Sequence, residues 1–287
     1  MVEPTRRRRW LEPSLVQRAL TASVLLAVFL AALLWLPRAL FAILVAGVVG
    51  LAGLEWSRLC GLSPALGRVY ATALVCAFGV LFWVAPSTAW ATQPWLGALF
   101  ATVTLFWIVA APAWMAYGLR AGAPRLLAGA GVLVLLPGAL AMLLLPPGLV
   151  LGTLALVWIA DSAAYFAGRS LGRHKLAPAI SPGKTWEGVG GGLLGVLVYA
   201  IICGYTIPEL ASRLGEGTAW LLYLSGGVLL CAVSIVGDLF ESAMKRQASV
   251  KDSGTLLPGH GGVLDRIDSA LAVLPVAALL FFADAFA

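Results

Sequence analysis

The sequence predicts an all-α, polytopic integral membrane protein with about nine transmembrane helices and a cytoplasmic amino terminus. Of its 287 residues, 61% are hydrophobic, and the mean hydropathy of +0.96 lies well above that of soluble domains. The chain also divides into apolar stretches of about 20 residues, the length that crosses a bilayer core. Finally, the basic residues lie between alternate stretches, as expected for a polytopic protein.

Nine apolar stretches follow one another along the chain. Each is expected to form a helix, because backbone polar groups in lipid must find partners within their own segment. Pro112, Pro137 and the glycines at 190–192 mark irregular points within them. The nine stretches cover residues 19–36, 39–54, 69–85, 95–115, 126–145, 149–167, 188–207, 219–240 and 269–286.

The distribution of basic residues sets the expected orientation. With a cytoplasmic amino terminus, all 19 lysines and arginines except Arg38 and Arg213 fall on the cytoplasmic side. A count that differed by one span would destroy this asymmetry. The basic amino-terminal run is interpreted as part of a start-transfer anchor that contacts anionic lipid, and nucleic-acid binding is not expected despite a pI near 9.4.

Charge also divides the chain into three expected regions. Residues 1–18 form a basic cytoplasmic segment, and residues 19–145 form a scaffold of about five helices with almost no charge inside the membrane. Glu55 is expected at a loop edge there. Residues 146–287 form a catalytic region of about four helices, with cytoplasmic polar loops at 168–187 and 241–268. The four cysteines show no paired spacing, which indicates neither a disulfide framework nor a zinc site.

The polar run at 238–268 is the most informative part of a chain that is only 11% charged. Asp238 is followed at helical spacing by residues 241, 242 and 245, and Asp265 and Asp268 repeat an i, i+3 relation. Two helix ends could thus direct carboxylates to one point. Carboxylate oxygens suit Mg²⁺, and nearby cations suit phosphate, so the run predicts a metal-assisted phosphoryl or nucleotidyl transfer site. The alternative is a solvated loop whose charges pair with one another.

Two further features precede this run. Asp161 lies within an apolar stretch, where an ionisable residue indicates function unless a neighbouring cation or the bilayer edge satisfies it. The loop at 168–187 offers Ser181, Lys184 and Thr185 as phosphate donors. It is not a Walker A motif, because Pro178 stands where that motif needs glycine and no strand is expected before it. The alternative for this loop is a purely topogenic role.

The polar run resembles the signature of the phosphatidate cytidylyltransferases, also called CDP-diacylglycerol synthases. The matching positions are Ser242, Met244, Lys245, Arg246, Lys251, Asp252, Gly254, Leu257, Pro258, His260, Gly261, Gly262, Val263, Asp265, Arg266, Ile267 and Asp268. The upstream run at 161–188 resembles another polar stretch of that family. The resemblance covers about residues 155–270, and the arginine-rich amino terminus is an extra feature outside it.

The resemblance implies an integral membrane enzyme that joins CTP and phosphatidic acid to give CDP-diacylglycerol and pyrophosphate, using Mg²⁺. Metal ligands would be Asp161, Asp238, Asp265 and Asp268. Catalytic residues would be Lys245, Arg246, Lys251, Asp252 and Arg266. Substrate-binding residues would be Ser181, Lys184, Thr185, Ser242, His260, Gly261 and Gly262.

Two other functions remain open from the residues alone. A CTP-dependent kinase of a polyisoprenoid alcohol would share the membrane setting but would have to deprotonate a hydroxyl group. A secondary transporter would place its charges near the midplane in two symmetric halves, and this chain lacks such symmetry. The expected location is the bacterial plasma (inner) membrane with the active site facing the cytoplasm. Homodimerisation, acyl-chain preference and the use of dCTP stay open.

Overall fold

The computed structural model describes residues 15–85, 93–118, 124–215, 217–256 and 261–284. Most of the basic segment expected at 1–18 therefore lies outside the described residues. The elements in chain order are α1 (Leu15–Trp35), α2 (Arg38–Leu59), α3 (Pro64–Val84), α4 (Pro94–Leu105), the π-helical turn η2 (Phe106–Ala110), α5 (Ala111–Tyr117), α6 (Pro124–Leu144), α7 (Pro147–Leu171), β1 (Lys175–Ala177), β2 (Ser181–Thr185), α8 (Trp186–Thr206), α9 (Pro208–Leu214), α10 (Thr218–Gln247) and α11 (Leu264–Asp284).

The predicted class, an all-α polytopic membrane protein, is confirmed. Within the described residues, seven helical segments are long and apolar enough to cross a membrane: α2, α3, the continuous segment Pro94–Tyr117, α6, α7, α8 and α10. The first and last expected stretches coincide with α1 and α11. The total of nine crossings stays a prediction.

Local chemistry explains where many of these helices begin. Proline is the first residue of α3, α4, α6, α7 and α9. Its missing N–H group is harmless in the first turn, and its fixed φ already suits a helix. At the start of α8, the Thr185 hydroxyl accepts a hydrogen bond from the Gly188 amide and caps the helix.

The polar segment at 168–187 is more ordered than the loop that the sequence predicts. Helix α7 continues to Leu171, and β1 and β2 then pair as an antiparallel hairpin, with Lys175 opposite Thr185 and Ala177 opposite Ser181. The expectation that no strand precedes Gly183 is therefore wrong, since β1 lies before it. A two-stranded hairpin can form here because the segment is short, turn-rich and outside the apolar stretches, where its free edges can meet water.

The second polar segment, expected as a loop at 241–268, also begins as a helix. Helix α10 runs for 30 residues and ends only at Gln247. Asp238, Glu241, Ser242 and Lys245 therefore do lie along one helix, as their spacing predicts.

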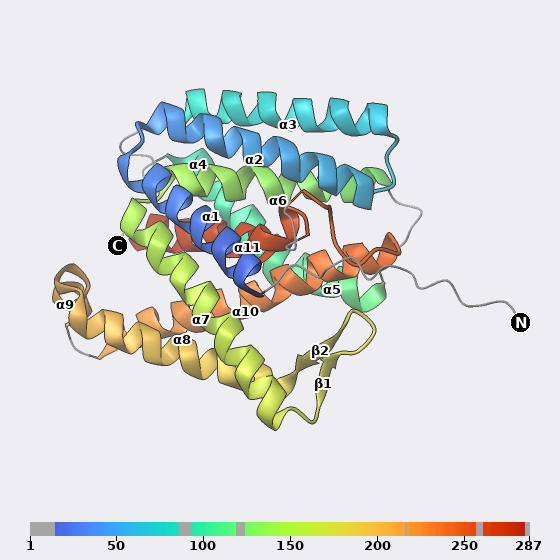
Figure 1. The fold of residues 1–287 in the computed structure, drawn as a ribbon. Coiled ribbons are helices and arrows are strands. Elements are labelled where there is room, and N and C mark those ends of the chain that lie inside the picture. Colours follow the sequence, from blue (N-terminus) through green and yellow to red (C-terminus); the bar gives the residue numbers. More distant parts are fainter. Residues whose placement is uncertain (1–14, 86–92, 119–123, 216, 257–260, 285–287) are drawn as a thin grey trace, which may run out of the picture.

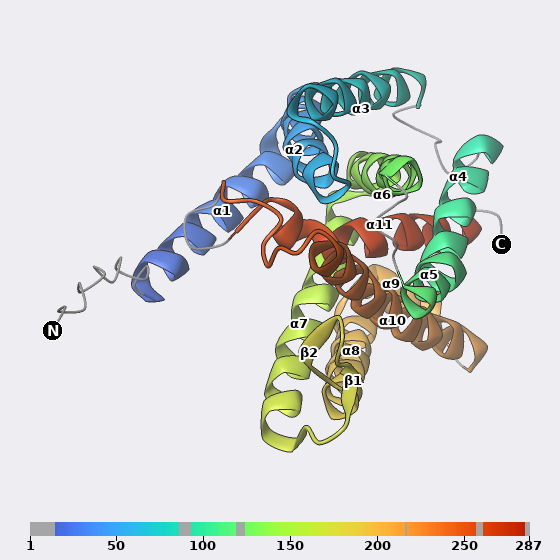
Figure 2. The ribbon, with the colours of Figure 1, turned by 90° about the vertical axis from the view of Figure 1, so that its right-hand side faces the viewer.

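Helices α10 and α11 lie at the centre of the molecule. They pack against each other, between the group formed by α2, α3 and α6 and the pair formed by α7 and α8 (Figures 1 and 2). The carboxyl end of α10, the amino end of α11 and the hairpin lie toward the same side, on the right in Figure 1. The polar segments are thereby brought to one end of the bundle.

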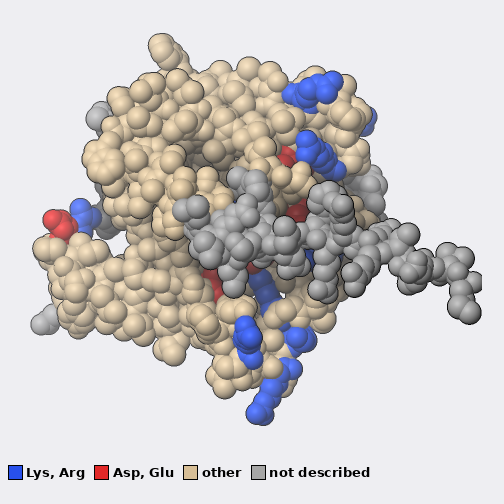
Figure 3. Space-filling view, in the orientation of Figure 1, with Lys and Arg blue, Asp and Glu red and all other residues tan. Residues whose placement is uncertain are grey.

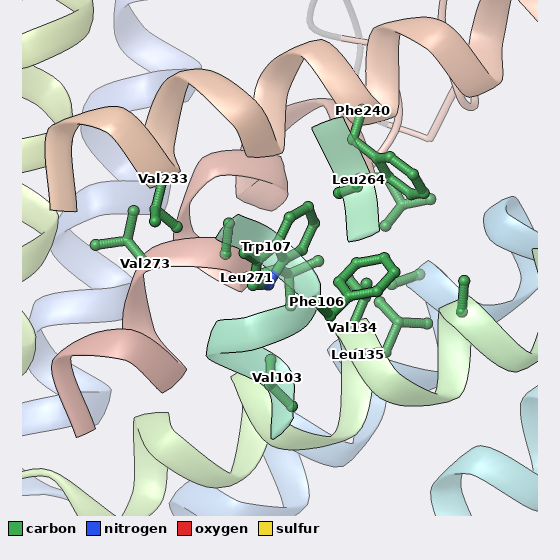
Figure 4. Close-up of a cluster of buried hydrophobic side chains, with 14 of the residues drawn as sticks. Val103, Phe106, Trp107, Val134, Leu135, Val233, Phe240, Leu264, Leu271 and Val273 are labelled. Carbon is green, nitrogen blue, oxygen red and sulfur yellow. The ribbon is translucent and has the colours of Figure 1, made fainter. Parts of the chain in front are cut away.

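An aromatic cluster packs the centre of the bundle directly beneath the polar end. The ring of Phe240 on α10 lies 5.6 Å from Phe106, 5.7 Å from Trp107, 5.9 Å from Trp114 and 6.4 Å from Trp56, centroid to centroid. Figure 4 shows Phe240 and Trp107 among the aliphatic side chains of α6 and α11. Phe240 precedes Glu241 in the chain, so this packing also holds the polar face of α10 in place.

Glycines allow α7 and α8 to approach closely. A Cβ atom at Gly191 would overlap the Cβ of Ala167, and one at Gly195 would lie 2.9 Å from the Cβ of Ala163. Small residues at this spacing are a common helix-packing device in membranes. Gly191 and Gly195 are therefore packing positions between α7 and α8.

We expect Gly191→Ala to destabilise the protein by about 1–3 kcal/mol, because the added methyl group must push α7 away from α8. Gly190→Ala is the matched control, since a Cβ there meets nothing within 4 Å. Thermal unfolding in detergent measures both variants. Equal melting temperatures for the two would contradict the close packing at Gly191.

Candidate functional site

Charged side chains gather at one end of the molecule. In Figure 3, the lysines and arginines of the visible face lie mainly along the right-hand and lower-right rim, over the hairpin and near the turn between α2 and α3. A separate acidic and basic pair lies at the opposite end, where α9 carries Glu209 and Arg213. Most of the remaining visible surface is uncharged. The end with the polar segments is thus the candidate site.

The hairpin and α10 are joined by an ion pair. Lys184 on β2 places its Nζ 2.7 Å from Oδ2 of Asp238, and both side chains are partly exposed. The other carboxylate oxygen of Asp238 accepts a hydrogen bond from Ser242 Oγ at 3.3 Å. The two polar segments predicted from the sequence therefore meet at Asp238.

Helices α10 and α11 are joined by Lys245. Its Nζ lies 2.5 Å from Oε2 of Glu241, one turn earlier on α10, and 2.7 Å from Oδ1 of Asp265 on α11. All three side chains are largely buried, with exposed fractions of 12%, 4% and 6% respectively. Buried charges are costly unless they are paired, so this triad has to stay assembled.

Asp265 also organises the segment between the two helices. Its Oδ2 accepts hydrogen bonds from the amide of Ser253 at 2.9 Å, the hydroxyl of Ser253 at 3.0 Å and the amide of Gly262 at 2.8 Å. Gly261 has a φ of +82°, a conformation that favours glycine. These contacts explain why glycines stand at positions 261 and 262 of the signature.

Glu55 is a site residue that the sequence analysis missed. It lies within α2, is only 4% exposed, and accepts hydrogen bonds from Ser253 Oγ and the amides of Val263 and Leu264, each at 2.9 Å. The expectation that it sits at a loop edge is wrong, because α2 extends beyond residue 54, where the apolar stretch was expected to end. A carboxylate inside a membrane-spanning helix was the available signal.

Two further carboxylates, those of Asp161 and Asp268, lie close enough to Asp238 for their charges to interact. Asp161 on α7 interacts with Asp238 and with Lys184, and Asp268 on α11 interacts with Asp238 and Asp161. Within the described residues, no three acidic, histidine or cysteine side chains converge closely enough to hold a metal ion by themselves. Mg²⁺ commonly takes one or two carboxylates and completes its shell with water and substrate phosphates. The oxygen donors of Asp161, Asp238 and Asp268 fit that pattern.

The remaining predicted residues occupy varied positions. Arg246 donates from Nε to the carbonyl of Ile180 and from Nη1 to that of Val250, each at 3.2 Å, which ties the hairpin to the end of α10. The hydroxyl of Thr185 is buried and caps α8, and Ser181 is half-buried. Lys251, Asp252 and Arg266 are exposed. His260 lies outside the described residues.

The arrangement has a clear chemical character. At this end of the bundle, the partly exposed pair of Lys184 and Asp238 lies one helical turn from the largely buried triad of Lys245, Glu241 and Asp265. Such an arrangement can bind a polyphosphate through its cations and a divalent metal through its carboxylates. The hairpin, α7, α10 and α11 each contribute side chains to it, and α2 supports it through Glu55.

This chain is similar in sequence to known proteins over most of its length. The model described as Cytidylyltransferase family matches residues 16–283. A phosphatidate cytidylyltransferase of Pseudomonas aeruginosa is 42% identical over 278 residues, which is 94% of this chain and 97% of that protein. Proteins of the same name from Haemophilus influenzae and Bacillus subtilis are 48% and 49% identical, over 134 and 120 residues respectively.

Those two shorter matches cover 46% and 42% of their proteins, so the agreement is concentrated in part of the chain. The family model and the Pseudomonas protein, in contrast, extend across both the amino-terminal helices and the polar end. The chain therefore belongs to the cytidylyltransferase family.

Proposed function

We propose that this protein transfers the cytidylyl group of CTP to phosphatidic acid, giving CDP-diacylglycerol and pyrophosphate. The observation that carries the proposal is its 42% identity with the Pseudomonas phosphatidate cytidylyltransferase over nearly the full length of both chains. The cluster of carboxylates and lysines at one end of a helical membrane protein supports it chemically. No separate observation favours the lipid kinase or the transporter.

In the proposed reaction, a phosphate oxygen of phosphatidic acid attacks the α-phosphorus of CTP. A new phosphorus–oxygen bond forms, the bond to the bridging oxygen between the α- and β-phosphates breaks, and that oxygen leaves with pyrophosphate. The attacking phosphate is already anionic at neutral pH, so no general base is needed. The main task of the site is to bring two anions together and to stabilise the charge of the leaving group.

The lysines of the site perform part of that task. Lys184 forms an ion pair with Asp238, and Lys245 forms ion pairs with Glu241 and Asp265. When nucleotide binds, the partly exposed Lys184 can turn toward its phosphates. Arg246, Lys251 and Arg266 supply further positive charge to the lipid phosphate and the triphosphate. Ser181, Ser242, His260, Gly261 and Gly262 complete the proposed substrate contacts.

Mg²⁺ is the proposed cofactor, and one or two of the carboxylates of Asp161, Asp238, Asp265 and Asp268 would hold it together with water and substrate phosphates. When bound, it neutralises the negative charge of the nucleotide phosphates and of the leaving pyrophosphate. Both carboxylate oxygens of Asp265 accept contacts, from Lys245 and from the segment before α11, and both oxygens of Asp238 likewise have partners in Lys184 and Ser242.

The proposed setting is the bacterial plasma membrane, with nine crossings, a cytoplasmic amino terminus and the site at the cytoplasmic face. This places the site where soluble CTP and the headgroup of phosphatidic acid can meet. The gathering of basic residues at that end supports the orientation. In this proposal, residues 146–287 carry the reactive groups and residues 19–145 form a scaffold. Glu55 is the one residue of the scaffold that we assign to the site.

Incubation of the purified protein with labelled CTP, phosphatidic acid and Mg²⁺ tests the function. We expect CDP-diacylglycerol and pyrophosphate in equal amounts, and loss of activity when a chelator removes divalent metal. Chromatography of the labelled lipid and a coupled pyrophosphate assay give the two yields. Release of CDP, or full turnover in chelator, is incompatible with the proposal.

Asp268→Asn tests the carboxylate cluster. The change removes one charge with little change of shape, and we expect turnover to fall by at least about 100-fold, since a metal ligand stabilises the transition state directly. Glu209→Gln on α9, at the opposite end of the molecule, is the matched control. Steady-state rates and the melting temperature are measured for both variants. Near-normal turnover of Asp268→Asn would instead favour the alternative that these charges only pair with one another and with water.

Asp265→Asn should combine two effects. It removes one of the two carboxylate partners of Lys245 and weakens the contacts to Ser253 and Gly262, so we expect a loss of about 1–3 kcal/mol of stability as well as a large loss of turnover. Comparison of its melting temperature with that of Asp268→Asn separates the two effects. An unchanged melting temperature would contradict the structural role of Asp265.

A further inference from the structure

Glu55 belongs to the half of the chain that carries no other part of the polar site. Glu55 is 4% exposed, yet its three hydrogen-bond donors among the described residues lie about 200 residues later, in the segment after α10 and at the first residue of α11. A buried carboxylate without partners would be strongly destabilising. The position of this segment and the burial of Glu55 therefore depend on each other.

Two of the donors are the amides at the start of α11. Leu264 is the first residue of that helix and Val263 precedes it, and their N–H groups donate to Oε2 and Oε1 of Glu55 respectively. Amides at the start of a helix have no partner within it, and a negative charge there is favourable. Glu55 thus caps α11 from another helix.

The third donor connects Glu55 to the site carboxylates. The hydroxyl of Ser253 lies 2.9 Å from Oε2 of Glu55 and 3.0 Å from Oδ2 of Asp265. Asp265 in turn pairs with Lys245, and Lys245 with Glu241. A continuous polar network therefore runs from α2 through the segment before α11 to α10.

Glycines show how closely the backbone surrounds Glu55. A Cβ atom at Gly254 would overlap the Glu55 carboxylate, and one at Gly262 would overlap both the Ser253 hydroxyl and that carboxylate. Two signature glycines thus lie against the Glu55 carboxylate, where any larger residue would collide with it. Asp265 and Asp268 lie in the first turn or just beyond it, so the capped end of α11 determines where they stand.

We infer that Glu55 is a positioning residue for cytidylyl transfer. It fixes the first turn of α11, and through it Asp265 and Asp268, although it does not itself contact the reacting atoms. The kinetic part of this inference rests on the proposed function, whereas the structural part does not.

Hydrogen exchange followed by mass spectrometry tests the structural part. Glu55→Gln keeps the shape of the side chain but turns an NH₂ group toward at least one of the three donors. We expect the amides of residues 262–266 to exchange about tenfold faster or more, because a charge-assisted cap is lost. Ser57→Ala is the matched control, since the Ser57 hydroxyl donates only to the Leu54 carbonyl of its own helix. Exchange at the wild-type rate in Glu55→Gln overturns the inference.

Kinetics test the positioning role. We expect Glu55→Gln to lower kcat by about 10-fold to 100-fold and to raise the Mg²⁺ concentration for half-maximal activity, with the KM for phosphatidic acid nearly unchanged. A role in stability alone would reduce the amount of folded protein and leave kcat per folded molecule and the Mg²⁺ dependence as in the wild type, which would overturn the inference.

Ser253→Ala is the second variant, and it tests the positioning role if Glu55→Gln does not fold. It breaks the link to Asp265 but leaves both backbone contacts of Glu55, so the same Mg²⁺ shift is expected at smaller size. Wild-type Mg²⁺ dependence in this variant counts against the inference. Failure of the wild-type protein to make CDP-diacylglycerol would reject the proposed function, and the exchange measurement would still decide whether Glu55 caps α11.

Discussion

The polar end of this protein depends on the buried ion pairs that Lys245 forms with Glu241 and Asp265. Its ammonium group joins Glu241 of α10 to Asp265 of α11 at the point where both helices leave the apolar interior. Loss of Lys245 would leave two buried carboxylates without a cation, which is strongly destabilising. The two helices that carry most of the site are therefore held in one register at that end.

The apolar interior supplies the other half of this arrangement. Phe240 packs against Trp56, Phe106, Trp107 and Trp114, which come from three other segments of the bundle. Within a membrane such packing replaces the hydrophobic driving force of soluble proteins, because lipid is as apolar as the side chains. The aromatic cluster holds α10 in the apolar interior at Phe240, and the charged network holds it nearer its carboxyl end at Lys245.

The site combines distant parts of the chain. The hairpin brings Lys184 to Asp238, α7 contributes Asp161, and α2 supports the start of α11 through Glu55. The amino-terminal helices are thus more than a scaffold that fills the membrane. This fits the whole-length agreement with the Pseudomonas protein, which extends well beyond the polar signature.

The sequence by itself determined the membrane class, the approximate helices and the residues of the signature. Apolar length, helical spacing and motif order are local properties, so the shared face of Asp238, Glu241 and Lys245 could be read from spacing alone. The family could be recognised because its signature is contiguous.

Only the tertiary structure decided which charges meet. Glu55 and Val263 are 208 residues apart, and no local pattern relates them. Lys184 finds Asp238 because a hairpin, and not a loop, follows α7. A charge in a membrane protein has to be paired, but its partner depends on how helices pack across the bundle, and that is a property of the whole chain.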